Sequence, residues 1–248
     1  MSSASEPTPL RALIRKLEGI ATLSDHDRRV IASLSFTLER LGPRQKVVNY
    51  GDTAPQCCVI LEGWVCCYRR LDEGTRQIMS FHIPGDLPDL QNFHLRVMDH
   101  SFATLTEVHV AFIPHDSLRD LILRFPSVAE VLWRNTLIDA AVFREWMVGI
   151  GRRSALGQIA HLICELYLKL HAVGLAENDR FSLPVTQNEL GDALGLSYVH
   201  VDRVLQELRG VRVITLRDRT LVIEDWDVLV QIAEFDATYL HLEKRAGS

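Results

Sequence analysis

Side chains suited to contacting the edges of nucleic-acid bases gather in one short stretch, Thr186–Gln206. Helical spacing in its second half leaves an outward face that consists of Tyr198, Val199, Asp202, Arg203 and Gln206. In a helix-turn-helix, the residues at the start of the second helix enter the major groove of DNA. The stretch therefore predicts a surface that reads DNA.

Two short helices and a tight turn are expected to position this face. Thr186 can cap the first helix, and Glu189 three residues later completes a capping box. Gly195 supplies a left-handed residue at the end of that helix, and Ser197 can cap the second. Gly191 is small where the two helices cross. An ordinary antiparallel helix pair is the alternative, but it would need these caps and glycines to coincide by accident.

The amino-acid sequence of the second helix is typical of a known family. The run Val199-His200-Val201-Asp202-Arg203, followed by Leu205-Gln206-Glu207-Leu208, resembles the Crp/Fnr family of bacterial transcription regulators in its alphaproteobacterial form. By this resemblance, Arg203 donates hydrogen bonds to a guanine, the commonest specific base contact. Val199 stands where a glutamate is common, so it can read a base only through apolar contact, for example with a thymine methyl group.

Further contacts are expected with the phosphate backbone, which position a protein without specifying sequence. Residues 212–216 and 220–223 alternate in polarity around Arg217-Asp218-Arg219, which predicts a two-stranded wing with a basic tip. Thr186 and Gln187 are expected to touch phosphate as well. The complete set of expected DNA contacts is Thr186, Gln187, Asn188, Ser197, Tyr198, Val199, His200, Asp202, Arg203, Arg217 and Arg219.

Composition limits the classes of protein to consider. The length of 248 residues suggests two domains. The formal net charge of -5 argues against a general polyanion binder, yet five arginines stand against three acidic residues between Asp202 and Arg219. No apolar run approaches the ~20 residues of a membrane helix, and residues 1–9 lack an export pattern, so we expect a cytoplasmic protein. Phosphate-cradling, nucleophile-elbow and zinc-protease motifs are absent from the sequence, so we do not expect an enzyme.

A β-rich segment follows two N-terminal helical patterns. From Phe36 onward, short alternating runs are separated by turn glycines at Gly51, Gly63, Gly74 and Gly85. This spacing predicts a strand meander closed into an antiparallel roll. The expected fold class is α+β: an N-terminal antiparallel, jelly-roll-like β-roll, a long dimerisation helix and a C-terminal winged helix-turn-helix.

The roll resembles the sensory domain of the same family, and its expected effector pocket consists of Gly85, Asp86, Arg96 and Ser101. Family members that bind cyclic nucleotides use a Gly-Glu pair and an arginine about ten residues later. Here Ser101 falls at the place of that arginine, and a serine cannot supply the bidentate fork that a cyclic phosphate requires. Arg96 could substitute from the loop. The sequence thus argues against a cyclic nucleotide and leaves the effector or cofactor unknown.

Cysteines and histidines offer other sensing chemistry. No cysteine precedes Cys57, which argues against the family's N-terminal iron-sulfur cluster. Counting outward from a turn at Glu62-Gly63 pairs Cys58 with Cys67, close enough for a disulfide or a shared soft metal. The alternative is that the cysteines are small buried hydrophobic residues. Histidines cluster in the same segment, but none has the spacing of helical metal ligands, so no metal site is expected.

The long helix is expected to run from its cap at Ser127 to about Ile150, followed by a hinge between Gly149 and Arg153. By resemblance it is the dimerisation helix, and the alternative is a helix packed only within its own subunit. The apolar stripe predicted along it comprises Val128, Val131, Leu132, Asn135, Ile138, Asp139, Val142, Trp146 and Ile150. The expected domains are 1–126 for helices and roll, 127–151 for dimerisation helix and hinge, and 152–248 for DNA binding.

Together these features predict a transcription regulator that binds an inverted repeat of double-stranded DNA as a homodimer, with RNA polymerase as a further partner. A signal at the roll would control it. Two alternatives stay open: a ligand-independent regulator whose roll is only a scaffold, and a regulator that responds to the redox state of thiols.

Overall fold

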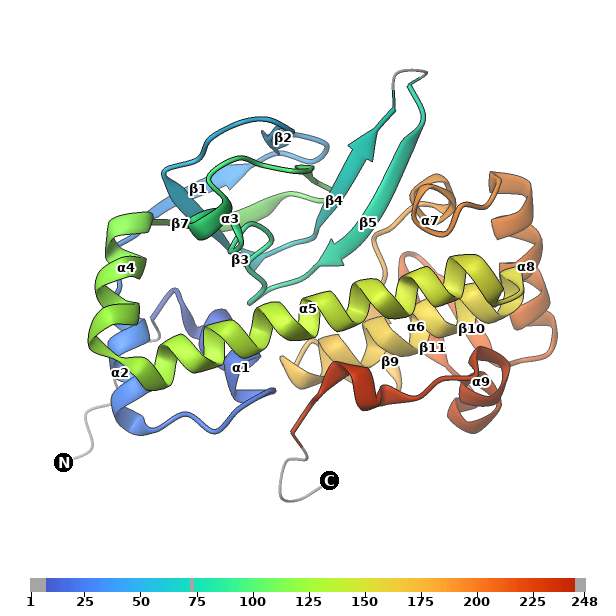
Figure 1. Ribbon diagram of the computed structural model, residues 1–248. Helices are drawn as coiled ribbons and strands as arrows, with labels where there is room; N and C mark the ends of the chain where they lie inside the picture. The colour runs from blue at the N-terminus through green and yellow to red at the C-terminus, as the bar shows by residue number, and fades with distance from the viewer. Residues whose placement is uncertain (1–7, 72–73, 244–248) are drawn as a thin grey trace. The chain divides into compact units, whose positions relative to one another are not determined.

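The strands of the N-terminal half form a two-sheet antiparallel roll (Figure 1). The computed structural model describes residues 8–71 and 74–243. One sheet has the strand order β1-β7-β3 and the other β2-β6-β4-β5. The strands are β1 (Thr37–Leu41), β2 (Lys46–Val48), β3 (Gln56–Glu62), β4 (Val65–Arg70), β5 (Arg76–His82), β6 (Ser101–Thr104) and β7 (Val108–Pro114).

The predicted turns are confirmed, but the predicted meander is wrong. The four turn glycines all have positive φ, between 84° and 97°. Most hydrogen-bonded strands are nevertheless distant in the sequence, because β7 pairs with both β1 and β3 while β2 pairs with β6. Glycines mark where the chain turns, whereas strand pairing depends on which apolar faces meet across the roll.

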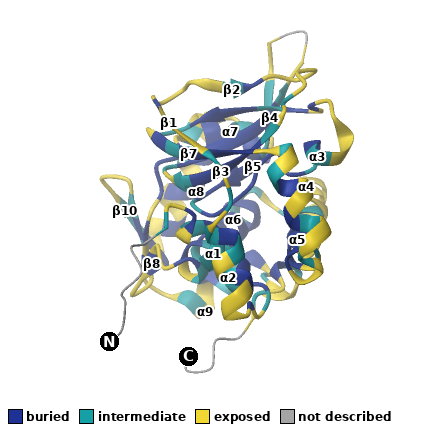
Figure 2. Cartoon of the chain, turned by 90° about the vertical axis from the view of Figure 1, so that its left-hand side faces the viewer, coloured by how far each residue is buried: buried dark blue, intermediate teal, exposed yellow. Residues whose placement is uncertain are grey.

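The core of the roll fills the space between its two sheets. It includes Leu41, Val48, Cys58, Ile60, Val65, Cys67, Met98, Phe102, Val108, Val110 and Phe112. Figure 2 shows β3 and β7 in the colour of buried residues, as this packing requires. The short helices of this half are α1 (Arg11–Glu18), α2 (Asp25–Ala32), α3 (Asn92–Leu95) and α4 (His115–Arg124).

Helix α5 (Pro126–Arg152) runs for 27 residues without a break. It begins one residue before the predicted cap, because proline suits the first helical position. The Ser127 hydroxyl instead donates to Asp27 Oδ1 of α2 at 2.6 Å.

The described residues fall into two compact units, and α5 contributes to both. One unit holds the chain up to Cys67, Phe81–Leu137 and Glu243; the other holds the described part of Tyr68–Ser80 and Ile138–Leu242. The compact units meet within α5, between Leu137 and Ile138. The predicted domain boundaries at 126/127 and 151/152, which divide the chain by function, stay a prediction.

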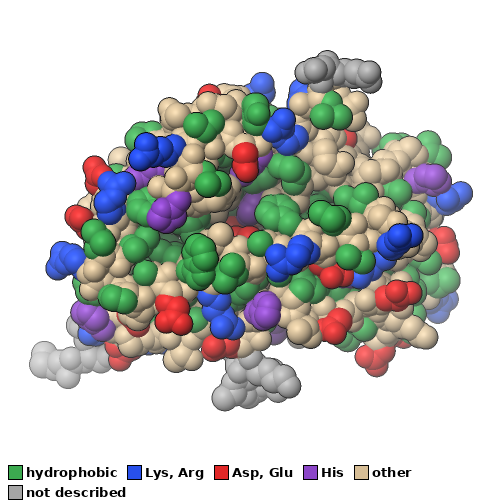
Figure 3. All heavy atoms as spheres, viewed as in Figure 1, with side chains coloured by type: hydrophobic (Ala, Val, Ile, Leu, Met, Phe, Trp, Pro, Cys, Tyr) green, Lys and Arg blue, Asp and Glu red, His purple; other side chains and the backbone are tan. Residues whose placement is uncertain are grey.

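Helix α5 is apolar on two faces rather than one. Most of the predicted stripe is buried inside the subunit, from Val128 to Trp146. A second set, which shares only Ile150 with the predicted stripe, is spaced alternately by three and four residues: Trp133, Thr136, Ala140, Phe143, Met147 and Ile150. Within it, Trp133 is 63% exposed and Met147 74% exposed. We call this set the α5 seam. Figure 3 shows apolar side chains among charged ones along this helix.

The C-terminal part is a winged helix-turn-helix. Its helices are α6 (Ala155–Ala172), α7 (Gln187–Leu194), α8 (Tyr198–Gly210), α9 (Trp226–Ala233) and the 3-10 helix η1 (Ala237–Leu240). A sheet of order β10-β11-β9-β8 contains the predicted wing and two strands that the sequence reading missed. These strands are β8 (Ala176–Glu177), β9 (Arg180–Ser182), β10 (Ile214–Arg217) and β11 (Thr220–Ile223).

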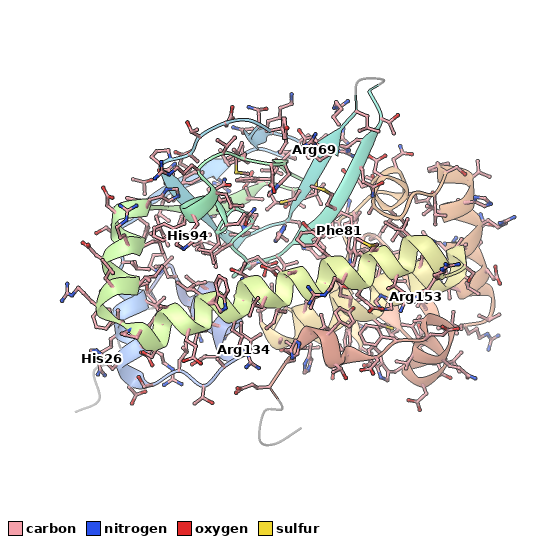
Figure 4. The ribbon with its side chains drawn as sticks, viewed as in Figure 1. His26, Arg69, Phe81, His94, Arg134 and Arg153 are labelled. Carbon is pink, nitrogen blue, oxygen red and sulfur yellow. The ribbon has the colours of Figure 1, made fainter. Side chains whose placement is uncertain are left out.

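A buried carboxylate ties the C-terminal half of α5 to this part. Glu165 of α6 accepts hydrogen bonds from Trp146 Nε1 at 3.0 Å and from the Tyr239 hydroxyl of η1 at 2.8 Å. Burial raises the pKa of Glu165. Arg153, at the C-terminal end of α5 in Figure 4, forms an ion pair with Glu145. These contacts cross the segment predicted as a hinge.

Across the described residues, no helix is long and apolar enough to cross a membrane.

The crossing of α7 and α8 depends on Gly191. A Cβ atom built there would lie 2.5 Å from the Leu196 carbonyl oxygen, which is too close for any side chain. We expect Gly191→Ala to lower the free energy of unfolding by about 1–3 kcal/mol through overpacking. The control is Gly210→Ala on α8, where nothing lies within 4 Å, and helix propensity there favours alanine by less than about 1 kcal/mol. Urea unfolding of both variants measures the free energy of unfolding. Equal stability of the Gly191→Ala and Gly210→Ala variants would contradict the prediction.

Candidate nucleic-acid interface

Three local motifs set the geometry of α7 and α8, and all three are confirmed. Thr186 Oγ1 accepts from the Glu189 amide at 3.2 Å, while the Glu189 carboxylate accepts from the Thr186 amide at 2.8 Å. Gly195 adopts the left-handed conformation at φ 68° and ends α7. Ser197 Oγ accepts from the His200 amide at 3.3 Å and begins α8. Each motif satisfies backbone groups that the end of a helix leaves unpaired.

Helix α8 presents one apolar face inward and the predicted reading face outward. Val201, Val204, Leu205 and Leu208 are buried. Tyr198 is 54% and Val199 73% exposed, although the ring of the one and the methyl groups of the other are apolar. Arg203 is exposed, and no hydrogen bond or ion pair involves it among the residues that the structure describes. The guanidinium is therefore available to an external acceptor.

Asp202 is held in place by two other side chains. Its Oδ1 accepts from Gln187 Nε2 of α7 at 3.2 Å, and its Oδ2 accepts from Gln206 Nε2 at 2.7 Å. Helical spacing in the sequence places Gln206 on the outward face but assigns it no role. The i, i+4 spacing of Asp202 and Gln206 was the available signal.

The wing carries the two predicted basic residues at its tip. Arg217 and Thr220 face each other across β10 and β11, so Asp218 and Arg219 form a two-residue turn. Both turn residues have positive φ, 47° and 62°, as a type I′ hairpin requires. The Arg219 carbonyl accepts from the Leu183 amide at 2.7 Å, which anchors the turn and leaves the Arg217 and Arg219 side chains exposed.

The remaining predicted DNA contacts also lie at the surface. Thr186, Asn188, Ser197 and His200 are exposed, while Gln187 is half-buried. All eleven predicted positions thus lie on α7, α8 and their caps or on the wing. Their contact with DNA stays a prediction.

The four residues predicted as an effector pocket lie apart from the cavity of the roll. Gly85 packs under α1, where an added Cβ would lie 2.5 Å from the Ala12 carbonyl oxygen. Asp86 Oδ1 lies 2.8 Å from Lys16 Nζ in a largely buried ion pair. Arg96 is exposed at the end of α3, and Ser101 Oγ accepts from the Tyr50 amide at 2.9 Å.

A cavity of about 550 Å³ instead opens between the strands β1 and β2 and the loop 52–56. Lys46, Gln45, Glu39 and Asp52 are among its polar lining residues, and Asp89 also lines it. Asp89 is 1% exposed, and its Oδ1 accepts from the Cys58 amide at 2.8 Å. Burial raises the pKa of Asp89 to about 7.

The predicted cross-strand pair of Cys58 and Cys67 is wrong as a hairpin pair. Cys58 lies opposite Phe112 of β7, and β3 and β4 belong to different sheets. Both cysteines face the same roll core. All five cysteines are buried and none forms a disulfide, and burial raises the pKa of the Cys58 thiol well above its ordinary value. A protonated, buried thiol reacts poorly, so the geometry disfavours a thiol switch.

Three histidines of the roll each lie beside a different carboxylate. His82, His100 and His109 lie 3.5, 2.6 and 3.2 Å from oxygens of Asp86, Asp99 and Glu62. His94, labelled in Figure 4, packs on Phe93 with ring centroids 4.6 Å apart. Within the described part of the chain, no group of three or more His, Cys, Asp or Glu residues could hold a metal ion.

Comparisons with known proteins agree on both parts of the chain. Residues 157–232 match the Crp-like helix-turn-helix domain, and residues 38–125 match the cyclic nucleotide-binding domain. The anaerobic regulatory protein of Haemophilus influenzae is 28% identical over 216 residues, covering 85% of this chain and 83% of the relative. The fumarate and nitrate reduction regulatory protein of Escherichia coli is 26% identical and covers 86% and 84%. The structure of FixK2 from Bradyrhizobium japonicum shares the fold, with a TM-score of 0.75, 23% identity, and coverage of 82% and 100%.

The buried carboxyl of the roll makes stability depend on pH. The pKa of Asp89 is about 7 in the folded chain, against an ordinary value of 3.8. The stability that this group contributes is therefore present below its unfolded pKa and is lost as the pH rises through about 7. We expect Asp89→Asn to reduce the fall in Tm between about pH 5 and about pH 8. Glu39→Gln, an exposed carboxylate at the same cavity, is the control. Thermal melts across this range test it, and identical pH slopes for wild type and Asp89→Asn would contradict it.

Proposed function

Because the chain belongs to the Crp/Fnr family of transcription regulators, we propose that it binds an inverted-repeat DNA site as a homodimer. The helix-turn-helix is its DNA-binding element. In the proposed complex, the α8 helices of two copies lie in successive major grooves, about 34 Å apart. The observation that carries the proposal is the exposed reading face of α8, with Arg203 free to donate.

Two further features support contact with DNA at this face. The exposed Val199 and Tyr198 at the start of α8 offer apolar surface to thymine methyl groups. Arg217 and Arg219 at the tip of the wing supply positive charge for the phosphate backbone. Base reading by α8 and positioning by the wing are thus assigned to different elements.

The α5 seam supports the homodimer. Alternate spacing by three and four residues keeps the seam along one line of the helix, as in a two-stranded coiled coil. Exposed apolar side chains such as Trp133 and Met147 would become buried against the same residues of a second copy. We expect the seam, rather than the stripe predicted from the sequence, to form the dimer contact.

We propose that the signal acts at the roll, whose cavity of about 550 Å³ is large enough for a small molecule. This cavity supports a sensing roll over one that is only a scaffold. In this proposal, residues 138–152 of α5 and the helix-turn-helix respond to the signal together, because hydrogen bonds among Trp146, Glu165 and Tyr239 connect them. Contact with RNA polymerase stays a prediction.

Arg203 gives a direct test of base reading. We expect Arg203→Ala to weaken binding to a selected site by about 1–3 kcal/mol and to relax preference at one base pair, with little loss on random DNA. Arg209→Ala is the matched control, since the Arg209 Nε donates to the Leu205 carbonyl of the same helix. Fluorescence anisotropy on both DNAs measures this, and an equal loss on random DNA would mean that Arg203 meets only phosphate.

The seam predicts which substitutions separate the dimer. We expect Met147→Glu to place charge within the interface, to weaken self-association at least about tenfold and to lower affinity for the inverted repeat in parallel. The control is Val148→Glu, the next residue, which is 49% exposed but lies off the seam. Sedimentation velocity over a concentration series measures association. If both variants remain dimers as the wild type does, another surface makes the contact.

A further inference from the structure

Asp202 is a negative charge on a surface proposed to face a polyanion. It lies on α8 directly before Arg203, is half-buried, and is the one carboxylate among the outward residues 198, 199, 202, 203 and 206. None of the ion pairs formed by described residues includes it. No ion pair within the described part of the chain therefore compensates its charge, and phosphate would repel it.

Two neutral amides hold this carboxylate instead. Gln187 Nε2 donates to Oδ1 from α7, and Gln206 Nε2 donates to Oδ2 from the next turn of α8. A flip of the Gln187 amide would bring its oxygen against the carboxylate, so the bridge also fixes the amide. Because both oxygens are restrained, the side chain loses little conformational freedom when it meets another donor.

The bridge leaves each oxygen able to accept once more. An ionised carboxylate has about four acceptor sites, and the two amides occupy two of them. In the major groove, the donor that aspartate matches is the N4 amino group of cytosine. Neither Val199 nor Tyr198 can supply an acceptor of this strength at the same face.

We propose that Asp202 determines specificity by accepting a hydrogen bond from the N4 amino group of a cytosine, at a position beside the base pair that Arg203 reads. The inference rests on the proposed function and adds to it a base and a residue. Each half of the DNA site would then contain a preferred cytosine in addition to the base pair that Arg203 reads. Gln187 and Gln206 are positioning residues that aim the carboxylate.

The test is selection of binding sites from random duplex DNA by the full chain, followed by competition binding with each base at the selected position. Wild type should prefer cytosine by about tenfold. Asp202→Asn should change the preference at that position to adenine, because an asparagine amide matches adenine N6 and N7. Asp202→Ala should lose the preference there and keep it at the position read by Arg203.

Glu207→Gln is the matched control, because it removes an exposed carboxylate from α8 outside the reading face. It should leave all base preferences unchanged. An unchanged preference in both Asp202 variants, with affinity raised or lowered equally on every sequence, would overturn the inference and leave Asp202 as a support for Gln187. If wild type selects no site, the proposed function fails, and the inference fails with it.

Discussion

Helix α5 carries apolar side chains on two faces, and this constrains the rest of the structure. One face is buried within the subunit, while the seam leaves Trp133 and Met147 largely exposed. Exposed apolar area costs about 25 cal/mol per Å², so a second copy that covered the seam would stabilise the chain. Because α5 passes unbroken through both compact units, the same helix that would form the dimer also contributes to the packing of the roll and of the DNA-binding part.

The proposed reading surface combines groups with different electrostatic requirements. Arg203 is free to donate, Asp202 is restrained to accept, and Val199 is exposed without hydrogen-bonding capacity. The three side chains match a guanine, a cytosine and a thymine methyl group respectively. Specificity of this kind needs a rigid support, which the capping box at Thr186 and the close crossing at Gly191 provide.

Local features were predictable from the sequence, and distant contacts were not. The caps at Thr186 and Ser197 and the turn at Gly195 depend on neighbouring residues, so the helix-turn-helix follows from its sequence. Strand pairing in the roll joins residues far apart, which is why Cys58 meets Phe112 rather than Cys67 as its strand partner.

The same limit explains the candidate sites of the roll and the dimer helix. The Gly85-Asp86 turn was recognisable, but its burial against α1 through Lys16 depends on packing that no motif encodes. For α5, apolar residues on two faces made either face a valid stripe. The sequence pattern could not say which one the subunit itself covers.

In the proposed complex, two copies present their reading helices across a two-fold axis. Hydroxyl-radical footprinting of wild-type protein on a selected site tests this most directly, because it maps contacts on both strands at single-nucleotide resolution. We expect two symmetric protected clusters on one face of the duplex, with centres about 10 base pairs apart. A single protected cluster, or two without a dyad between them, would contradict the account.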